Sequence, residues 1–364
     1  MKKILLVCVT SQNVITFRRS FIEKLKEKNY EVSVVAFDRE YEEEIKKLGI
    51  GFFCIEDNNR STNPLKILSL KSRYKKVIQS VKPDIVFSFM LKPNTFGVLA
   101  AKSAGVKQIF SMVEGIGDVF VKDSLKWKIV RTVVSFLYKR SLRHSSKVFF
   151  LNPDDIEEFV SRGLVQREKC QRINGIGVDL EHFSEKPIKN LKSFIMVARM
   201  LRTKGVFEYC ECARRVKKQY PDAVFSYLGG EGNVKVTDIQ EYIDDGSINY
   251  LGTAKDVRPY LEDSICFVLP SYYREGLPMS IMEAEATGRC IITTDNVGCR
   301  ETVKDGYNGF LLDCHDVDGL AEKCIYIIEN PEQTLAMCKN SRQFAIEHFD
   351  QKEINQQIME ILES

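Results

Sequence analysis

The sequence predicts an α/β protein with two doubly wound parallel sheets, one in each half of the chain. Short apolar, β-rich segments alternate with longer segments of helical periodicity, which is the pattern of a parallel sheet covered by helices. The length of 364 residues exceeds that of one ordinary core and fits two domains of about 180 residues each.

In the first half, six segments are expected to be strands: residues 4–9, 31–36, 51–55, 85–89, 108–112 and 147–151. Helical patterns separate them, notably at residues 17–28, 64–80 and 95–104. The alternation lapses over residues 175–189, where Gly, Asp, Pro and Lys accumulate, and we place the linker there.

A second series begins after this linker. Its expected strands are residues 194–197, 223–228, 248–251, 265–269 and 290–294. Helical patterns close the chain at residues 316–329, 332–348 and 351–362. The expected domains are therefore residues 1–180 and 190–349.

Charge is distributed unevenly along the chain. Residues 1–189 carry 34 basic against 22 acidic side chains, a net charge of +12. Residues 190–364 carry 19 against 28, a net charge of −9. A basic first half indicates an anionic partner. The sequence contains no recognised nucleic-acid motif, so we do not expect that partner to be nucleic acid.

The cysteine pattern and hydropathy predict a cytoplasmic protein. The eleven cysteines are scattered and show no metal-ligand spacing, which is typical of reduced thiols. No segment approaches the roughly 20 apolar residues of a membrane span. The apolar run at residues 4–9 is too short for a signal peptide and is expected to be a strand.

Two glutamates, Glu275 and Glu283, lie eight residues apart across a predicted strand-to-helix turn. In open α/β sheets, ligands bind at the carboxyl ends of strands, where we expect Glu275. The turn between them, Gly276-Leu277-Pro278-Met279, precedes a helix whose positive end suits an anion such as a diphosphate. The alternative is a capped surface helix with two solvated glutamates.

Two cations and two glycines are further candidates. Arg199 and Lys204 follow the first strand of the second series and suit a diphosphate, although surface cations are often merely solvated. Gly229 and Gly230 indicate either a phosphate loop or a tight strand–helix turn. Asp316-Val317-Asp318 has the spacing of a metal-binding pair, but a helix cap explains it better, and we predict no metal.

These motifs together resemble the retaining family-4 glycosyltransferases, which have the two-domain GT-B fold. The resemblance rests on Glu275 and Glu283, on Arg199 with Lys204-Gly205, and on three glycine motifs at residues 228–232, 250–252 and 305–309. Segments 94–102, 113–117 and 177–180 are similar to one subgroup, the α-1,3-N-acetylgalactosaminyltransferases acting on bacillosamine linked to undecaprenyl diphosphate.

The resemblance implies two Rossmann-like domains facing a central cleft, with the C-terminal helix at 350–364 crossing back onto the first domain. It implies a retaining transferase that moves a sugar from a UDP-sugar to a lipid-diphosphate-linked glycan, without metal or cofactor. N-acetylgalactosamine is the expected sugar and N-acetylglucosamine the next. The alternatives are a UDP-sugar epimerase and a non-catalytic sugar-nucleotide binding protein.

The resemblance also implies residue roles. Arg199 and Lys204 would stabilise the departing UDP, Glu283 would bind the ribose, and Glu275 would contact the donor sugar. Many family members place a histidine near the donor sugar, and here Glu114 stands in that neighbourhood. Glu114 is therefore a candidate for orienting the acceptor or handling its proton, the alternative being a capped loop acid.

The segment 122–147 indicates a membrane contact. It carries eight basic residues against one acid, Asp123, interleaved with apolar residues that include the only tryptophan, Trp127. This mixture is typical of a helix at an anionic lipid interface, and it fits a peripheral location on the inner face of the cell membrane. The alternative is a core helix with a solvated polar face.

Overall fold

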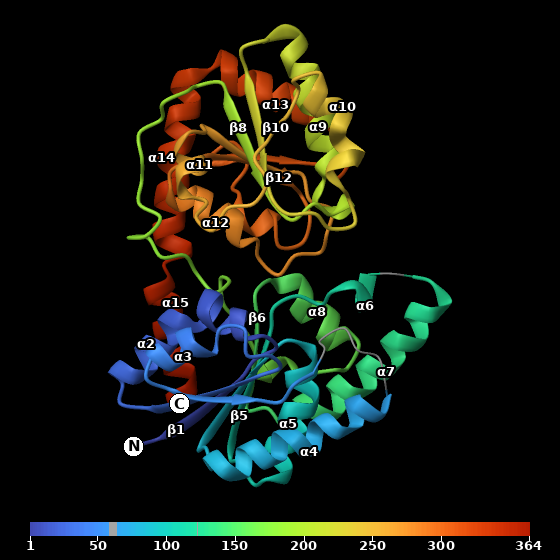
Figure 1. Cartoon of the computed structure of the whole chain (residues 1–364), viewed down its shortest axis with the longest axis vertical. Coiled ribbons are helices and arrows are strands. Elements are labelled where there is room, and N and C mark those ends of the chain that lie inside the picture. Colours follow the sequence, from blue (N-terminus) through green and yellow to red (C-terminus); the bar gives the residue numbers. More distant parts are fainter. Residues whose placement is uncertain (58–63, 122) are drawn as a thin grey trace. The chain divides into compact units, whose positions relative to one another are not determined.

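The computed structural model describes residues 1–57, 64–121 and 123–364, which form two units (Figure 1). Unit 1 contains residues 1–176 and 352–364, and unit 2 contains residues 177–351. Each unit has its own parallel sheet flanked by helices. The predicted α/β, doubly wound fold class is confirmed.

Unit 1 is built on a seven-stranded sheet of order β3-β2-β1-β4-β5-β6-β7. The strands are β1 Lys3–Val7, β2 Glu31–Ala36, β3 Gly51–Cys54, β4 Ile85–Phe89, β5 Gln108–Val113, β6 Lys147–Phe150 and β7 Cys170–Arg172. The chain direction across the sheet reverses between β1 and β4, which pair in parallel from Ile4–Ile85 to Val7–Ser88. The central strands β1 and β4 are apolar almost throughout, as is expected where helices bury both faces of a sheet.

The helices of unit 1 include two π-helical turns. These turns, η1 Val14–Arg18 and η2 Pro93–Gly97, follow β1 and β4 and therefore flank the reversal point. The other helices are α1 Ser11–Asn13, α2 Arg19–Glu27, α3 Glu42–Lys47, α4 Pro64–Val81, α5 Val98–Ser103, α6 Asp118–Val121, α7 Leu125–Leu142, α8 Pro153–Ser161, η3 Arg167–Lys169 and α15 Gln351–Glu363.

Unit 2 is built on a six-stranded sheet of order β10-β9-β8-β11-β12-β13. The strands are β8 Ser193–Val197, β9 Val224–Leu228, β10 Asn249–Tyr250, β11 Cys266–Leu269, β12 Cys290–Thr294 and β13 Gly309–Leu312. The helices are η4 Arg202–Lys204, α9 Val206–Gln219, η5 Val236–Ile239, α10 Gln240–Asp244, α11 Arg258–Glu262, α12 Met279–Ala286, η6 Arg300–Thr302, α13 Val317–Glu329 and α14 Pro331–His348.

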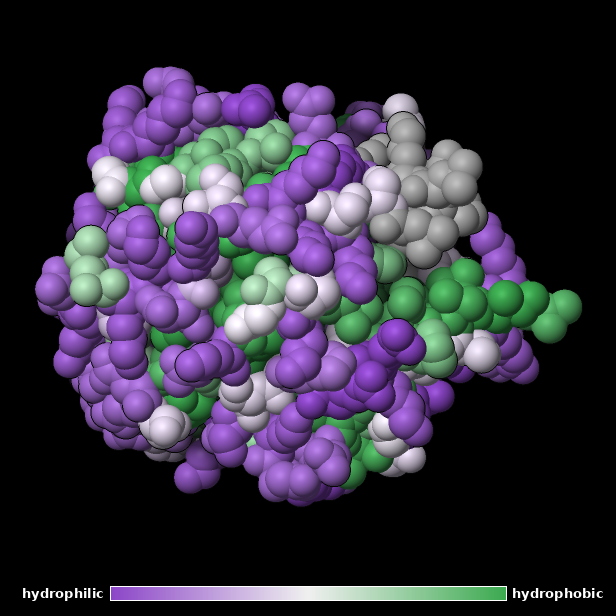
Figure 2. All heavy atoms as spheres, turned by 90° about the horizontal axis from the view of Figure 1, so that it is seen from below, coloured by the Kyte–Doolittle hydropathy of each residue, from purple (hydrophilic) through white to green (hydrophobic). Residues whose placement is uncertain are grey.

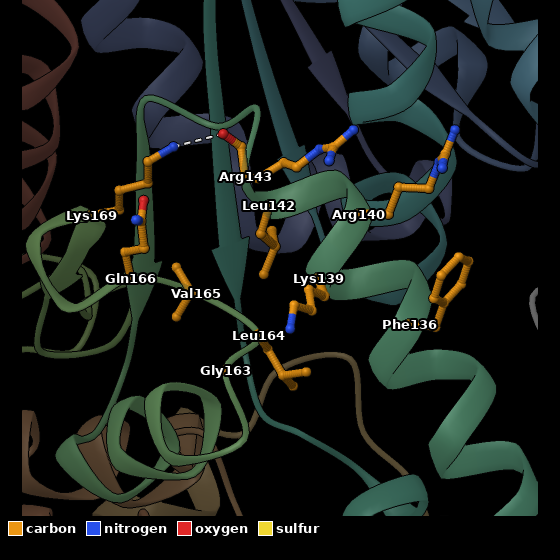
Figure 3. Close-up of a pocket in the computed structure, with 10 residues that line it drawn as sticks. All are labelled: Phe136, Lys139, Arg140, Leu142, Arg143, Gly163, Leu164, Val165, Gln166 and Lys169. Atoms are coloured by element: carbon orange, nitrogen blue, oxygen red, sulfur yellow. Dashed lines mark hydrogen bonds between the residues drawn. The ribbon is translucent and has the colours of Figure 1, made fainter.

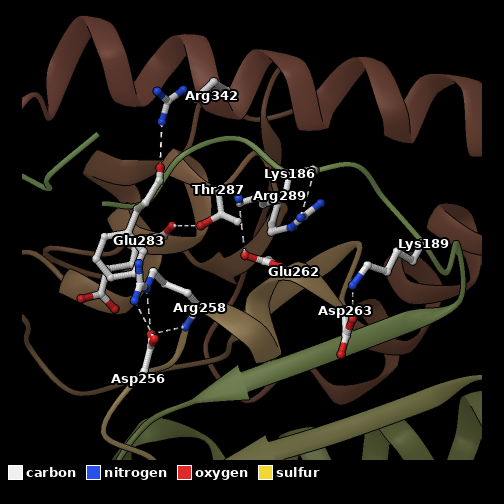
Figure 4. A network of polar contacts seen from close by, with 11 residues as sticks. Lys186, Lys189, Asp256, Arg258, Glu262, Asp263, Glu283, Thr287, Arg289 and Arg342 are labelled. Carbon is white, nitrogen blue, oxygen red and sulfur yellow. Dashed lines mark hydrogen bonds and ion pairs between the residues drawn. The ribbon is translucent and has the colours of Figure 1, made fainter. Parts of the chain in front are cut away.

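The segment 175–189, where we placed the linker, is fastened to unit 2 in its later part. The guanidinium of the buried Arg289 donates to the Lys186 carbonyl at 3.0 Å, and Lys189 pairs with Asp263 at 2.9 Å (Figure 4). The chain thus joins unit 2 at Gly177. None of the helices formed by the described residues has the length and apolarity that a membrane span needs.

Candidate active site

The carboxyl ends of β8 and β11 lie side by side in unit 2. These two strands pair in parallel, and the order of the sheet reverses between them. The chain leaves β8 through Arg199 and η4, and it leaves β11 through the loop that holds Glu275. Ligands of doubly wound sheets bind at this reversal point, so the fold brings three of the predicted residues to one edge.

Lys204 and Glu275 are in direct contact. The Lys204 ammonium pairs with Glu275 Oε1, and Ser271 Oγ donates to the same oxygen at 3.0 Å. The two side chains are only 19% and 11% exposed. The Tyr273 ring lies 5.8 Å from Lys204 Nζ. An ion pair that is shielded from water to this extent is held more firmly than one on an open surface.

The backbone fixes the two loops against each other. The amides of Tyr272 and Tyr273 both donate to the Thr203 carbonyl at 2.9 Å. Gly205 adopts φ +80°, and a Cβ there would lie 2.2 Å from the Pro270 carbonyl oxygen. Only glycine allows this approach of the chain. The position of Lys204 therefore depends on main-chain packing around it.

Arg199 lies on the same edge but is exposed, and it forms no ion pair within the described part of the chain. The neighbouring glycine turn has a structural explanation. A Cβ at Gly229 would lie 1.8 Å from the Ala198 carbonyl oxygen, and the Gly229 amide donates to the Gly252 carbonyl at 2.7 Å. Close packing thus requires glycine at 229, whereas at Gly230 a Cβ would meet only the Thr253 methyl group, at 3.1 Å.

Glu283 lies one turn into α12, beyond the turn at residues 276–279. Its carbonyl accepts from Thr287 Oγ1 at 2.8 Å (Figure 4). The side chain is partly buried, and burial raises the pKa of its carboxyl to about 7. A carboxyl with this pKa changes charge near neutral pH.

Glu285, which also lies on α12, was not among the residues predicted from the sequence. Glu285 is fully buried, and burial raises its pKa well above the usual value. Asn308 Nδ2 donates to Glu285 Oε1 at 2.8 Å and to the Thr302 carbonyl at 3.2 Å. This hydrogen bond ties α12 to the motif at residues 305–309. The only sequence feature that could have pointed to it is that Asn308 belongs to this motif.

Glu114 lies in unit 1, directly after β5. Its carboxylate pairs with the guanidinium of Arg18, which is buried and stacks 4.0 Å over the Phe89 ring. Burial lowers the pKa of Arg18 to about 10, so the arginine remains charged at neutral pH. The π-helical turn η1 ends at Arg18, and the sequence pattern gave no sign of this partner.

The Asp316-Val317-Asp318 segment is a helix cap. Asp316 Oδ1 accepts from the Gly319 amide at 2.8 Å at the start of α13, and Asp318 pairs with Arg215. The cap interpretation is confirmed. Nowhere in the described ranges do three histidine, cysteine or carboxylate side chains gather as a metal ion would need.

The architecture is that of the GT-B class of glycosyltransferases. A glycosyltransferase from Rickettsia africae superposes with a TM-score of 0.80 and 18% identity, covering 99% of this chain and 98% of its own. Anabaena HepE in complex with UDP superposes with a TM-score of 0.82 and 18% identity, covering all of both chains. At this identity the likeness establishes the fold.

Sequence comparison identifies the family. The model of glycosyl transferases group 1 matches residues 178–344, and the glycosyl transferase 4-like model matches residues 3–152. The N,N'-diacetylbacillosaminyl-diphospho-undecaprenol alpha-1,3-N-acetylgalactosaminyltransferase of Campylobacter jejuni is 32% identical over 95% of this chain and 94% of its own. An Escherichia coli UDP-Gal:alpha-D-GlcNAc-diphosphoundecaprenol alpha-1,3-galactosyltransferase is 30% identical over 78% and 75%. The chain belongs to the retaining family-4 glycosyltransferases.

Proposed function

We propose that this glycosyltransferase moves N-acetylgalactosamine from its UDP-linked form to a glycan carried on undecaprenyl diphosphate. The support is the full-length similarity to a Campylobacter jejuni enzyme named for that transfer. The Escherichia coli relative is named for a galactose transfer to another sugar on the same lipid diphosphate. The lipid diphosphate is thus common to both relatives, whereas the donor sugar differs.

The donor site we propose lies at the reversal point of unit 2. Arg199 and Lys204 bind the diphosphate, because two cations at a strand's carboxyl end stabilise the charge that develops on departing UDP. The amides around Gly276, Leu277 and Met279 add the positive end of α12. Glu283 accepts hydrogen bonds from the ribose, and Glu275 accepts them from the donor sugar.

The contact between Lys204 and Glu275 carries this proposal most directly. It holds the cation that we assign to the diphosphate beside the carboxylate that we assign to the donor sugar, so both assigned roles fall on one pair of residues. Retention by front-side substitution fits this arrangement, because the leaving phosphate then takes the acceptor proton and no protein nucleophile is required. We propose that Glu114, held by Arg18, orients the acceptor hydroxyl.

The deciding experiment assays UDP-N-acetylgalactosamine, UDP-N-acetylglucosamine and UDP-galactose against undecaprenyl-diphosphate-linked acceptors. We expect transfer with retained anomeric configuration and a preference for UDP-N-acetylgalactosamine. Release of an epimerised sugar without acceptor would establish the epimerase alternative. Donor binding without turnover on any acceptor would establish a non-catalytic binding protein.

Two variants test the assigned roles. Glu275→Gln should mainly lower kcat, since Glu275 is the carboxylate assigned to the transferred sugar. Glu283→Gln should mainly raise the KM for the donor by about ten- to hundredfold, the usual effect of losing hydrogen bonds to a charged group. Glu332→Gln, an exposed glutamate on α14, is the control. Wild-type kinetics in both site variants would contradict the assignment.

We further propose that the protein works in the cytoplasm, bound peripherally to the inner face of the cell membrane. Its acceptor is lipid-linked under this proposal, so the reacting sugar stands close to the headgroups. The basic first half of the chain would be attracted to anionic lipid.

A further inference from the structure

Helix α7 has two apolar faces. Val134, Tyr138 and Leu142 are buried in the core of unit 1. On the other face, Leu125, Ile129, Val133 and Phe136 are 76%, 60%, 54% and 63% exposed. An ordinary amphipathic helix has one apolar face, directed to the core. The second face therefore requires an explanation outside the fold of unit 1.

These four side chains form one continuous line, which we name the outer stripe. They follow one another at intervals of four, four and three residues, so they share one side of the helix. With Val121, they make up five of the eleven exposed large apolar side chains among the described residues. Figure 2, a view of the molecule from below, shows hydrophobic side chains that project together at one edge. Such clustering marks an interaction surface, whereas scattered exposed apolar residues do not.

Cations border the outer stripe. Lys126 and Lys128 are exposed beside its first turns, and Lys139 and Arg140 are exposed at its end. The nearby acid, Asp123, lies 3.7 Å from the Lys128 ammonium. Lys122, another basic residue of this segment, lies outside the described residues. A border of positive charge alone complements an anionic lipid surface, whereas a protein partner of mixed charge would not explain it.

A cavity of about 470 Å³ adjoins the end of the outer stripe at Phe136 (Figure 3). The described residues that line it include Lys139, Arg140, Arg143 and Lys169, and no carboxylate. Lys169 Nζ donates to the Arg143 and Ser145 carbonyls at 2.7 and 2.9 Å, which fixes its charge on the wall. We name this cavity the basic hollow.

The basic hollow is separate from the acceptor-orienting position proposed for Glu114. Lys169 immediately precedes β7, whereas Glu114 immediately follows β5. The strands are parallel, so Lys169 lies at the amino ends of the strands and Glu114 at their carboxyl ends. The hollow is therefore available to an anion other than the acceptor diphosphate.

We propose that the outer stripe of α7 lies in the headgroup–acyl boundary of an anionic phospholipid bilayer and that the basic hollow receives a phospholipid headgroup phosphate. The stripe supplies apolar burial, and the cations supply charge attraction, the two contributions by which interfacial helices bind membranes. This inference deepens the membrane partner of the proposed function and names the residues that contact it.

The test is co-sedimentation of the full chain with phosphatidylcholine vesicles, with and without phosphatidylglycerol, across a salt series. One variant replaces the stripe with Ile129→Ser, Val133→Ser and Phe136→Ser. Its control is Leu335→Ser with Ile346→Ser, two exposed apolar residues of unit 2. The second variant is Arg140→Ala with Arg143→Ala, and its control is Lys218→Ala with Lys339→Ala, two exposed lysines of unit 2.

We expect wild-type protein to bind anionic vesicles more tightly than neutral ones and to be released by salt. The arginine variant should lose about fivefold per cation removed, and the stripe variant should lose at least about tenfold on both lipids. Both controls should bind as wild type does. Trp127, on α7, reports by its emission whether the helix stays folded.

Binding that ignores lipid charge, or stripe and control variants that bind alike, would overturn the inference. So would self-association abolished by the stripe variant, because a second copy of the chain would then be the occupant. Transfer to a detergent-dispersed acceptor is measured in parallel. If the wild-type protein transfers sugar normally but does not bind vesicles, this inference fails and the proposed function stands. If it binds vesicles but transfers no sugar, the proposed function fails and this inference stands.

Discussion

Lys204 and Glu275 form an ion pair between the loops after β8 and β11, and Ser271 Oγ donates to the same carboxylate oxygen. The pair orients a cation and a carboxylate at the reversal point of unit 2. Each side chain therefore fixes the other, and the two should behave as one functional group.

The first prediction is that Lys204→Ala and Glu275→Ala are not additive. Each should lower kcat/KM by about ten- to hundredfold. The double variant should lose far less than the product, with a coupling free energy of about 1–3 kcal/mol. A double-mutant cycle on kcat/KM measures this. Strict additivity would mean that the pair has no shared role.

The second prediction concerns Glu283, whose pKa of about 7 lies above the usual 4.5. The folded protein holds this proton more tightly than the unfolded chain, so stability falls as pH rises from about 4.5 to 7 and then levels off. Glu283→Gln should therefore be about 1–3 kcal/mol more stable than wild type above pH 7 and equal to it below pH 4.5. Urea unfolding across this range decides it, and a pH-independent difference would contradict it.

The third prediction is that Arg199 matters for catalysis and that a metal does not. Arg199→Ala should lower kcat by about a hundred- to a thousandfold, as for the loss of a donor that stabilises charge developing in the transition state. Arg202→Ala, a neighbouring exposed arginine stacked on Phe207, is the control. Activity should survive excess EDTA. Loss with chelator and rescue by magnesium or manganese would refute the metal-independent mechanism.

The fourth prediction concerns the buried partner of Glu114. Arg18→Ala should destabilise unit 1 by about 3–5 kcal/mol, because it removes a buried side chain stacked on Phe89 and leaves the largely buried Glu114 carboxylate without this partner. Arg19→Ala, one residue further, removes an exposed pair with Glu23 and should cost under about 1 kcal/mol. Urea denaturation compares them, and equal effects would rule out a stabilising role of the buried pair.

The fifth prediction separates backbone strain from backbone contact. Gly205→Ala combines φ +80° with an overlap on the Pro270 carbonyl, whereas Gly246→Ala has φ +72° and open space. Gly246→Ala should cost about 1–2 kcal/mol, the cost of a left-handed L-residue. Gly205→Ala should cost clearly more and weaken UDP binding. Thermal unfolding with and without UDP provides the measurement.

Hydrophobic pattern predicted most of the fold because central parallel strands read as continuous apolar runs. The edge strands β7 and β13 were missed. Cys170–Arg172 is short and polar, and Gly309–Leu312 starts at a glycine directly after a turn that contains Gly306. The π-helical turns η1 and η2 were also missed, because their side-chain pattern differs little from that of an α-helix.

Motif spacing placed Arg199 and Lys204 after one strand and Glu275 after another, and the order of the sheet brings these two strand ends to one edge. Spacing could not reveal the contact between Lys204 and Glu275, since these residues are 71 positions apart. The Arg18–Glu114 pair was hidden for the same reason. Long-range pairing depends on the order of strands, which an alternating pattern does not specify.

Helix α15 belongs to unit 1 but follows unit 2 in the sequence, and this order affects when unit 1 can fold during synthesis. Its buried residues Ile354, Ile358, Met359 and Leu362 belong to unit 1, and Asn355 Nδ2 donates to Ser20 Oγ at 2.7 Å. These residues leave the ribosome after every residue of unit 2. Unit 1 therefore cannot bury the apolar residues that pack against α15 until α15 has left the ribosome. Chaperones have that interval in which to bind the enzyme.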